Sequence, residues 1–212
     1  MKVVEIQARE AQDAFGGVPM VGGEPVEAFD SYKRPPFIEA AHFTVSDRTA
    51  IDLVVIHSME SSEKPGTARS VAEWFNDPSR APQASAHYCV DSLEVIQCVR
   101  EKDIAWAAPG ANKNGIHIEH AGRAAQSVPE WQDEFSTAML YLSIGLCAEI
   151  CRAWSIPAVF VGPAGLLHGD RGVTTHAAVS VAFKKSTHTD PGTAFPSRWY
   201  VAMVAARLAV SA

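Results

Sequence analysis

The stretch DLVVIH, residues 52–57, decides the fold expected of this chain. Its central residues are uninterrupted aliphatic side chains, a pattern typical of a strand that is buried on both faces of a sheet. A sheet with such strands has helices packed over it. His57 follows at the carboxyl end of the strand, where the end of the strand can bring its side chain to one edge of the sheet.

Further strands are expected on both sides of this stretch. SAHYCVD (85–91) and EVIQCV (94–99) predict a hairpin that turns at Ser92 and Leu93. The other expected strands are AHFTV (41–45), GIHIEHA (115–121) and AVFV (158–161).

Helices are expected between these strands and after them. ARSVAEWF (68–75) is amphipathic, with Thr67 as its cap and Asn76, Asp77 and Pro78 at its end. The longest helix starts at the S-x-x-E capping box of residues 127–130, and its apolar residues continue at steps of three or four to residue 153. Ser197 can cap a final helix. Together these elements predict an α/β fold in which a mixed central β-sheet is flanked by helices.

Composition restricts the possible partners of the chain. A chain of 212 residues with 47% hydrophobic and 20% charged residues is long enough for one substantial globular domain. The net charge of −6 provides no basic field, so nucleic acid is not expected as a partner. Residues 1–35 contain two Gly-Gly pairs and little periodicity, which indicates an N-terminal extension or linker before a compact domain at 36–212.

No export signal or membrane span is expected. Residues 1–15 lack a continuous apolar segment, and WYVAMVAARLAV near the end is interrupted by Arg207 and shorter than the roughly 20 residues that a span needs. A cytoplasmic location without a membrane partner follows as the expectation. The four cysteines are expected to be reduced, although Cys89 and Cys98 on paired strands could form a disulfide.

Three residues combine into a candidate metal site. His57, His176 in GVTTHAAV and Asp190 in HTDPG each lie where a strand end or turn can reach the same sheet edge. Two imidazoles and one carboxylate leave a fourth tetrahedral position open on zinc, which is the arrangement of a catalytic site. Each residue alone has an ordinary interpretation as a strand-end histidine, a surface helix residue or a turn residue before Pro-Gly.

The order of the segments resembles a known family. VVIHSME, SAHYCVD, AWAAPGANKNGIHIEHAG, RGVTTHAAVS and THTDPG are similar to the successive signature segments of zinc-dependent N-acetylmuramoyl-L-alanine amidases. That family includes phage endolysins, a cytosolic muropeptide-recycling amidase and animal peptidoglycan recognition proteins. The resemblance extends from about residue 38 to about residue 196. The residues of these segments are most similar to those of the amidase domains of actinobacterial phage endolysins.

The resemblance implies a role for each matched residue. The metal ligands fall on His57, His176 and Asp190, and the general-base carboxylate falls on Glu119. A glutamate within an apolar strand also indicates a side chain that points into a cleft. His188 occupies the position where the family often has a lysine that stabilises the oxyanion, so the expected pH optimum depends on an imidazole.

Two histidines flank the expected base on its own strand. Because side chains alternate along a strand, His117 shares a face with Glu119 whereas His120 points to the other face. His120 is therefore expected to lie away from the catalytic water.

Other residues are expected to contact the substrate. The family commonly has Trp-His where this chain has Trp106 and Ala107, so any contact made by that imidazole is missing. The candidate substrate-binding residues are His87, Tyr88, Trp106, Asn112 and Asn114.

The resemblance implies hydrolysis of the amide bond between N-acetylmuramic acid and L-alanine in bacterial peptidoglycan, with Zn²⁺ as cofactor. A monomeric phage endolysin is expected, held in the host cytoplasm and released to the cell wall at lysis. A host recycling amidase and a non-catalytic peptidoglycan-binding module are alternatives, and retention of all three ligands and Glu119 argues against the second. A structural zinc site is a poorer alternative because it would require a fourth protein ligand.

Overall fold

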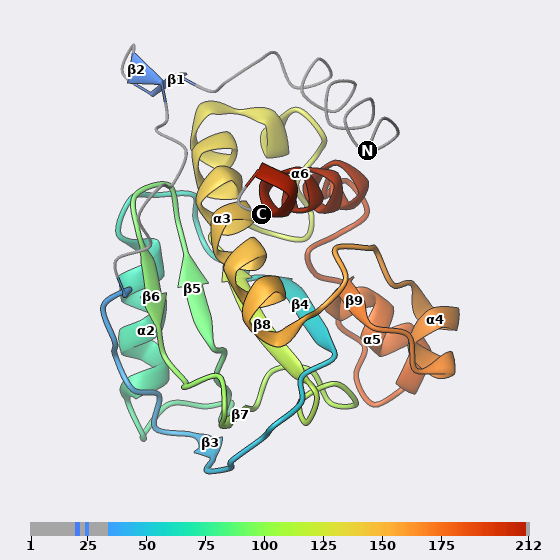
Figure 1. Ribbon diagram of the computed structural model, residues 1–212. Helices are drawn as coiled ribbons and strands as arrows, with labels where there is room; N and C mark the ends of the chain where they lie inside the picture. Colours follow the sequence, from blue (N-terminus) through green and yellow to red (C-terminus); the bar gives the residue numbers. More distant parts are fainter. Residues whose placement is uncertain (1–19, 22–23, 26–33, 211–212) are drawn as a thin grey trace.

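The computed structural model describes residues 20–21, 24–25 and 34–210 (Figure 1). Its centre is a five-stranded sheet in which only the edge strand β6 is antiparallel to its neighbour. From that edge the strands are β6 (Val95–Gln97), β5 (Tyr88–Val90), β8 (Gly115–His120), β4 (Leu53–Ser58) and β9 (Gly172–Thr175). The predicted α/β class with a mixed central sheet is confirmed.

The strand β4 has the central position that its sequence predicts. It pairs in parallel with β8 on one side and with β9 on the other, and all of its residues are buried. The predicted hairpin is also present, since Val90 of β5 lies opposite Val95 of β6. The Asp91 carboxylate closes this turn by accepting hydrogen bonds from the backbone N–H groups of Leu93 and Glu94.

Two short sheets accompany the central one. The strand β3 (Phe43–Thr44) pairs with β7 (Ile104–Ala105), so AHFTV forms a much shorter strand than predicted. The strands β1 (Met20–Val21) and β2 (Glu24–Pro25) pair with each other. The remainder of the predicted extension at 1–35 lies almost entirely outside the described residues.

One face of the central sheet is covered by two helices that pack on each other, α3 (Glu134–Trp154) and α6 (Ser197–Val210) (Figure 1). Alternate residues of the central strands point to this face, among them Val54, Ile56, Ile116 and Ile118. They form the largest buried cluster together with α3 and α6.

The other face is covered in two separate places. The helix α2 (Thr67–Asn76) packs on β5 and β6, whereas α4 (Pro163–His168) and α5 (His176–Phe183) lie at the β4–β9 side (Figure 1). The buried residues accordingly divide into two clusters, one around Phe75 and one around Val179. Between them, none of the helices described here covers the carboxyl ends of β8 and β4.

The start of α3 differs from the predicted one. Glu130 accepts a hydrogen bond from the N–H of Ser127, as in a capping box, but the Ser127 hydroxyl also donates to Glu130 instead of accepting from its N–H. The turn that follows is the 3₁₀ helix η1 (Glu130–Gln132). The helix itself begins after Asp133, whose carboxylate accepts from the N–H of Ser136. Asp133, rather than Ser127, is therefore the residue that caps the start of α3.

Other boundaries also differ. Gly66 rather than Thr67 caps α2, and the Thr67 hydroxyl instead donates to the Ser62 carbonyl. The predicted strand AVFV reduces to a single bridge between Phe160 and Val173. The strand β9 was not predicted, because Gly172 and two threonines give it no apolar run.

The cysteines agree with the prediction of reduced thiols. All four are free and buried, and the sulfur atoms of Cys89 and Cys98 lie 3.9 Å apart. Cys89 and Cys98 are small packing residues beneath α2, and Cys147 and Cys151 of α3 are part of the largest buried cluster.

The helix α3 has the length and hydropathy of a possible membrane span. However, 67% of its most apolar window is buried inside the protein, against the sheet and α6. This is the burial of a core helix.

Two glycines with the same backbone conformation provide a test of how tightly the loops pack. Gly192 and Gly66 have φ of 88° and 87°, but a Cβ on Gly192 would lie 1.9 Å from the Ala124 carbonyl oxygen, whereas none lies within 4 Å at Gly66. Gly66→Ala should cost about 1 kcal/mol through φ alone. Gly192→Ala should cost a further 1–3 kcal/mol or so, because backbone must shift. Urea unfolding measures both, and equal losses would contradict the packing of the 122–126 and 189–192 loops.

Candidate functional site

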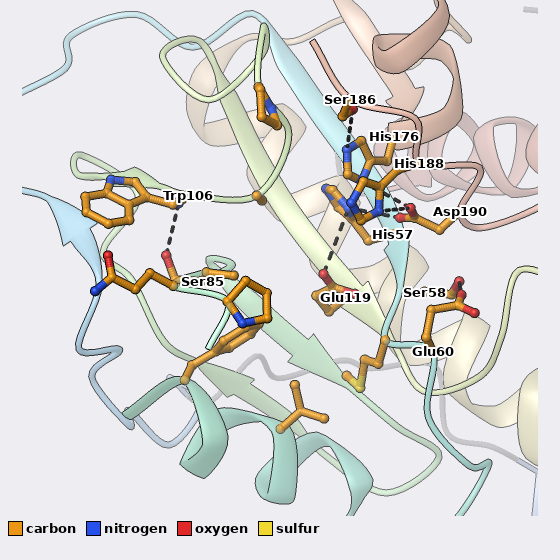
Figure 2. A pocket seen from close by; sticks show the side chains of 18 of the residues that line it. His57, Ser58, Glu60, Ser85, Trp106, Glu119, His176, Ser186, His188 and Asp190 are labelled. Carbon is orange, nitrogen blue, oxygen red and sulfur yellow. Dashed lines mark hydrogen bonds and ion pairs between the residues drawn. The ribbon is translucent and has the colours of Figure 1, made fainter. Parts of the chain in front are cut away.

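The gap between α2 and α5 forms a cleft of about 640 Å³. Apolar residues of α2 line one side, and residues from the start of α5 and the loop after it line the other. His57, Glu119, His176, His188 and Asp190 all lie on this cleft (Figure 2).

The strand register brings the candidate ligands together. His57 lies near the end of β4, and His176 is the first residue of α5, directly after β9. Because Ile56 pairs with Thr175 across these parallel strands, the two imidazoles are neighbours, with ring centroids 4.7 Å apart. Asp190 is tied to the start of α5 by a hydrogen bond from the N–H of Ala177 to its carbonyl.

The geometry of these three residues fits a metal ion. Nδ1 of His57 and Nδ1 of His176 each lie 3.1 Å from a different oxygen of Asp190, and the ligand atoms of all three lie within 4.8 Å of one another. Tetrahedral ligands at about 2.0–2.2 Å from zinc are separated by about 3.4 Å. All three side chains are buried, and they converge on one point at the cleft (Figure 2).

The protonation states also suit a metal site. Burial lowers the pKa of His57, despite the opposing effect of Asp190, and so favours the neutral imidazole. Burial opposes ionisation of Asp190, but hydrogen bonds from His176 and His57 outweigh it and hold the pKa of that carboxyl far below its usual range. A neutral imidazole and an ionised carboxylate are the forms that bind metals.

Glu119 lies beside this cluster. It pairs with His57 across β8 and β4, and its Oε1 is 3.9 Å from Nδ1 of His57. Within the described part of the chain, its buried Oε2 has no hydrogen-bond partner. Burial, and next the negative charges of Asp190 and Glu60, raise the pKa of Glu119 well above its ordinary value.

His188 lies at the mouth of the site. Its ring stacks on His176 with centroids 4.4 Å apart, and its Nδ1 is 3.3 Å from Oδ1 of Asp190. The side chain is 64% exposed, so it can meet a ligand that enters the cleft.

Two of the predicted substrate-binding residues lie on the cleft. Trp106 lies on the cleft (Figure 2) and is 37% exposed. Its indole N–H donates to the Thr44 hydroxyl, which fixes the ring. Asn112 also lines the cleft, but its side-chain oxygen accepts from the N–H groups of Ala107 and Ala108. Asn112 therefore shapes the loop that carries Trp106.

The other three do not line the cleft, which corrects the sequence interpretation. His87 is wholly buried and accepts a hydrogen bond from the N–H of His117. Tyr88 points to the α3 face of the sheet, and its hydroxyl donates to Glu101. Asn114 donates to Asp52 at the amino ends of β8 and β4, whereas the site lies toward their carboxyl ends, roughly 17 Å along the strands.

The alternation along β8 is confirmed. Nδ1 of His117 lies 3.0 Å from Nε2 of His57 on the site's face. His120 points to the α3 face, where its ring nitrogens meet the Ser143 hydroxyl and the His57 carbonyl.

Two further cleft residues were missed from the sequence. Glu60 has φ of 51° and lies near the mouth, and its carboxylate accepts from the Ser58 hydroxyl and the Ala124 N–H. Ser186 contacts Nε2 of His176 at 3.3 Å. Glu60 is the last residue of the segment VVIHSME, and Ser186 directly precedes THTDPG, so their positions in the sequence were the available signal.

Comparisons with known proteins agree with this geometry. The family described as N-acetylmuramoyl-L-alanine amidase (Amidase_2) matches residues 47–193. N-acetylmuramoyl-L-alanine amidase A of Achromobacter lyticus is 33% identical over 174 residues, which cover 78% of this chain and 89% of that protein.

Solved structures share the fold. The Staphylococcus aureus hydrolase AmiA superposes with a TM-score of 0.62 at 13% identity, covering 82% of this chain and 84% of that one. The endolysin amidase LysCS of Clostridium intestinale superposes with a TM-score of 0.53 at 14% identity, covering 82% and 96%.

A mixed sheet with a His–His–Asp cluster and a buried glutamate at its carboxyl edge defines an α/β protein of the amidase and peptidoglycan-recognition fold class. Within that class, the chain belongs to the N-acetylmuramoyl-L-alanine amidase family. Its activity is that of a peptidoglycan amidase.

Replacing Glu60 tests the electrostatics of the site. The negative charge of Glu60 raises the pKa of Glu119, so Glu60→Gln should lower that pKa while the amide oxygen still accepts from Ser58 and Ala124. Carboxyl ¹³C NMR titration of the metal-free protein measures the change. Glu63→Gln is the matched control, because the Glu63 charge is not among the causes of the Glu119 shift. An unchanged pKa in Glu60→Gln would contradict this coupling.

Proposed function

We propose that this chain is a zinc-dependent amidase that hydrolyses the bond between the lactyl group of N-acetylmuramic acid and L-alanine. The observation that carries the proposal is the convergence of His57, His176 and Asp190 beside the buried carboxyl of Glu119. These three ligands leave one side of the site open to the cleft, as a catalytic zinc site requires.

The proposed cofactor and the protein divide the chemistry. A bound zinc ion would supply Lewis-acid polarisation of the scissile carbonyl and would lower the pKa of a water molecule toward about 7. Glu119 accepts the proton of the attacking water and returns it to the leaving amine of L-alanine. Its raised pKa suits the first step, because a carboxylate of higher pKa is a stronger base.

His188 stabilises the oxygen anion that develops on the carbonyl. One ring nitrogen faces Asp190, and the exposed ring can direct its other nitrogen toward the substrate. Trp106 lies on the opposite side of the cleft and provides an exposed ring for sugar or peptide groups (Figure 2).

The proposed biological role is that of a phage endolysin. The residues of the five signature segments support this role, and the name of the structurally similar Clostridium intestinale protein is in keeping with it. In this proposal residues 36–212 form a monomeric catalytic domain after an N-terminal extension, kept in the host cytoplasm until lysis. A recycling amidase would share the chemistry but prefer soluble muropeptides, so the relative rates on intact sacculi and on muropeptides distinguish the two roles.

Metal removal tests the reaction. After chelation, release of stem peptides from purified peptidoglycan should cease, and stoichiometric zinc should restore it. Mass spectrometry of the digest should show intact stem peptides that begin with a free L-alanine amine. Full activity of the metal-free protein, or products cut within the peptide or glycan, would refute the proposal.

Replacing Glu119 separates catalysis from metal binding. Glu119→Gln should retain one zinc per chain and lower kcat by about 10²–10⁴-fold, because the amide cannot accept the proton. Asp190→Asn is the matched control and should lose zinc along with activity. Zinc content by atomic emission and kcat measure the two effects, and loss of zinc in Glu119→Gln would show that Glu119 is a ligand.

A further inference from the structure

The proposed metal ligand His57 has a second buried partner. Its Nδ1 faces Asp190, and its Nε2 lies 3.0 Å from Nδ1 of His117 on the neighbouring strand. His57 and His117 are 1% and 0% exposed, so water does not compete for this contact.

The proton positions on this histidine pair depend on what occupies the site. A carboxylate only accepts, so without metal the Nδ1 of His57 carries the proton that is donated to Asp190. Nε2 of His57 is then bare and accepts from Nδ1–H of His117. A metal-bound Nδ1 carries no proton, and a neutral His57 must then hold its proton on Nε2 and donate it to His117.

We propose that His117 is a positioning residue that holds the His57 ring in place in both states by exchanging donor and acceptor roles with it. The inference rests on the metal site of the proposed function. Each ring keeps one proton when metal binds. The proton between the rings moves from Nδ1 of His117 to Nε2 of His57. Nε2 of His117 gains the proton that leaves Nδ1 of His57. The ring of His57 need not turn when metal binds.

The surroundings of His117 fix its ring for this role. It stacks on His87 with centroids 5.6 Å apart and an interplanar angle of 15°. On the same face of β8, Gly115 leaves room, because a Cβ there would lie 3.3 Å from Nε2 of His117. The backbone N–H of His117 donates to Nδ1 of His87, which orients the ring beneath it.

The other nitrogen of His117 argues against a purely structural role. Nε2 is buried and, among the residues described, has no hydrogen-bond partner. A buried polar atom without a partner lowers stability, and an apolar side chain of similar size would avoid that cost. The contact with His57 is the interaction that an apolar side chain could not replace.

Zinc affinity of matched variants tests the proposal. His117→Leu removes the partner and should weaken zinc binding about 10–100-fold in a competition assay with a chromogenic chelator. His117→Asn keeps an acceptor and donor near the Nδ1 position and should recover most of the affinity. His120→Leu removes a buried imidazole that contacts the His57 carbonyl rather than its ring, and should bind zinc nearly as tightly as the wild type.

Side-chain ¹⁵N NMR of the wild-type protein provides a test that needs no variant. Both rings should carry the proton on Nδ1 in the metal-free protein and on Nε2 in the zinc-loaded protein. An unchanged tautomer of His117, or equal zinc affinity of His117→Leu and wild type, would overturn the role of His117 alone. Failure of the wild type to bind zinc would instead overturn the proposed metal site, and this inference with it.

Discussion

The parallel pairing of β4 with β8 on one side and β9 on the other is the constraint on which the site depends. This register sets His57 opposite Glu119 and, one residue beyond the Ile56–Thr175 pair, beside His176. A slip of one residue in either pairing would turn a side chain to the α3 face and separate the cluster. The aliphatic run of β4 fills the core on both faces of the sheet, and the pairing of its backbone with β8 and β9 fixes where His57 lies.

The unequal covering of the two sheet faces explains where the cleft lies. The helices α3 and α6 cover one face, and there the His120 ring contacts the Ser143 hydroxyl, which also contacts the Tyr200 hydroxyl. On the other face, α2 and the α4–α5 pair form separate clusters, and the ends of β8 and β4 stay accessible between them. Neighbouring histidines of one strand, His117 and His120, thus belong to different environments because side chains alternate.

Much of the fold and part of the site could be predicted from the sequence, wherever a local sequence pattern has a direct structural cause. The aliphatic run of β4, the hairpin and the position of Glu119 in an apolar strand each have a local physical cause. His87 and Tyr88 could not be placed, because a hairpin's pattern does not tell which face packs against which helix. Asn114 does not reach the cleft although Asn112 of the same loop does, because loop composition does not show which residues of a loop face a site. The start of α3 was missed because Ser127 and Asp133 both have capping chemistry, and tertiary packing selects Asp133.

The pKa values of two carboxyl groups in the same site, Asp190 and Glu119, are shifted in opposite directions by their surroundings. Both are partly removed from water, which by itself favours the neutral acid. Hydrogen bonds from two imidazoles reverse this for Asp190 and hold its pKa low. Among residues 34–210 and the short β1 and β2 strands, no donor reaches Oε2 of Glu119, and the nearby negative charges raise its pKa further. The difference in hydrogen bonding, rather than in burial, therefore makes one group suited to hold a cation and the other to transfer a proton.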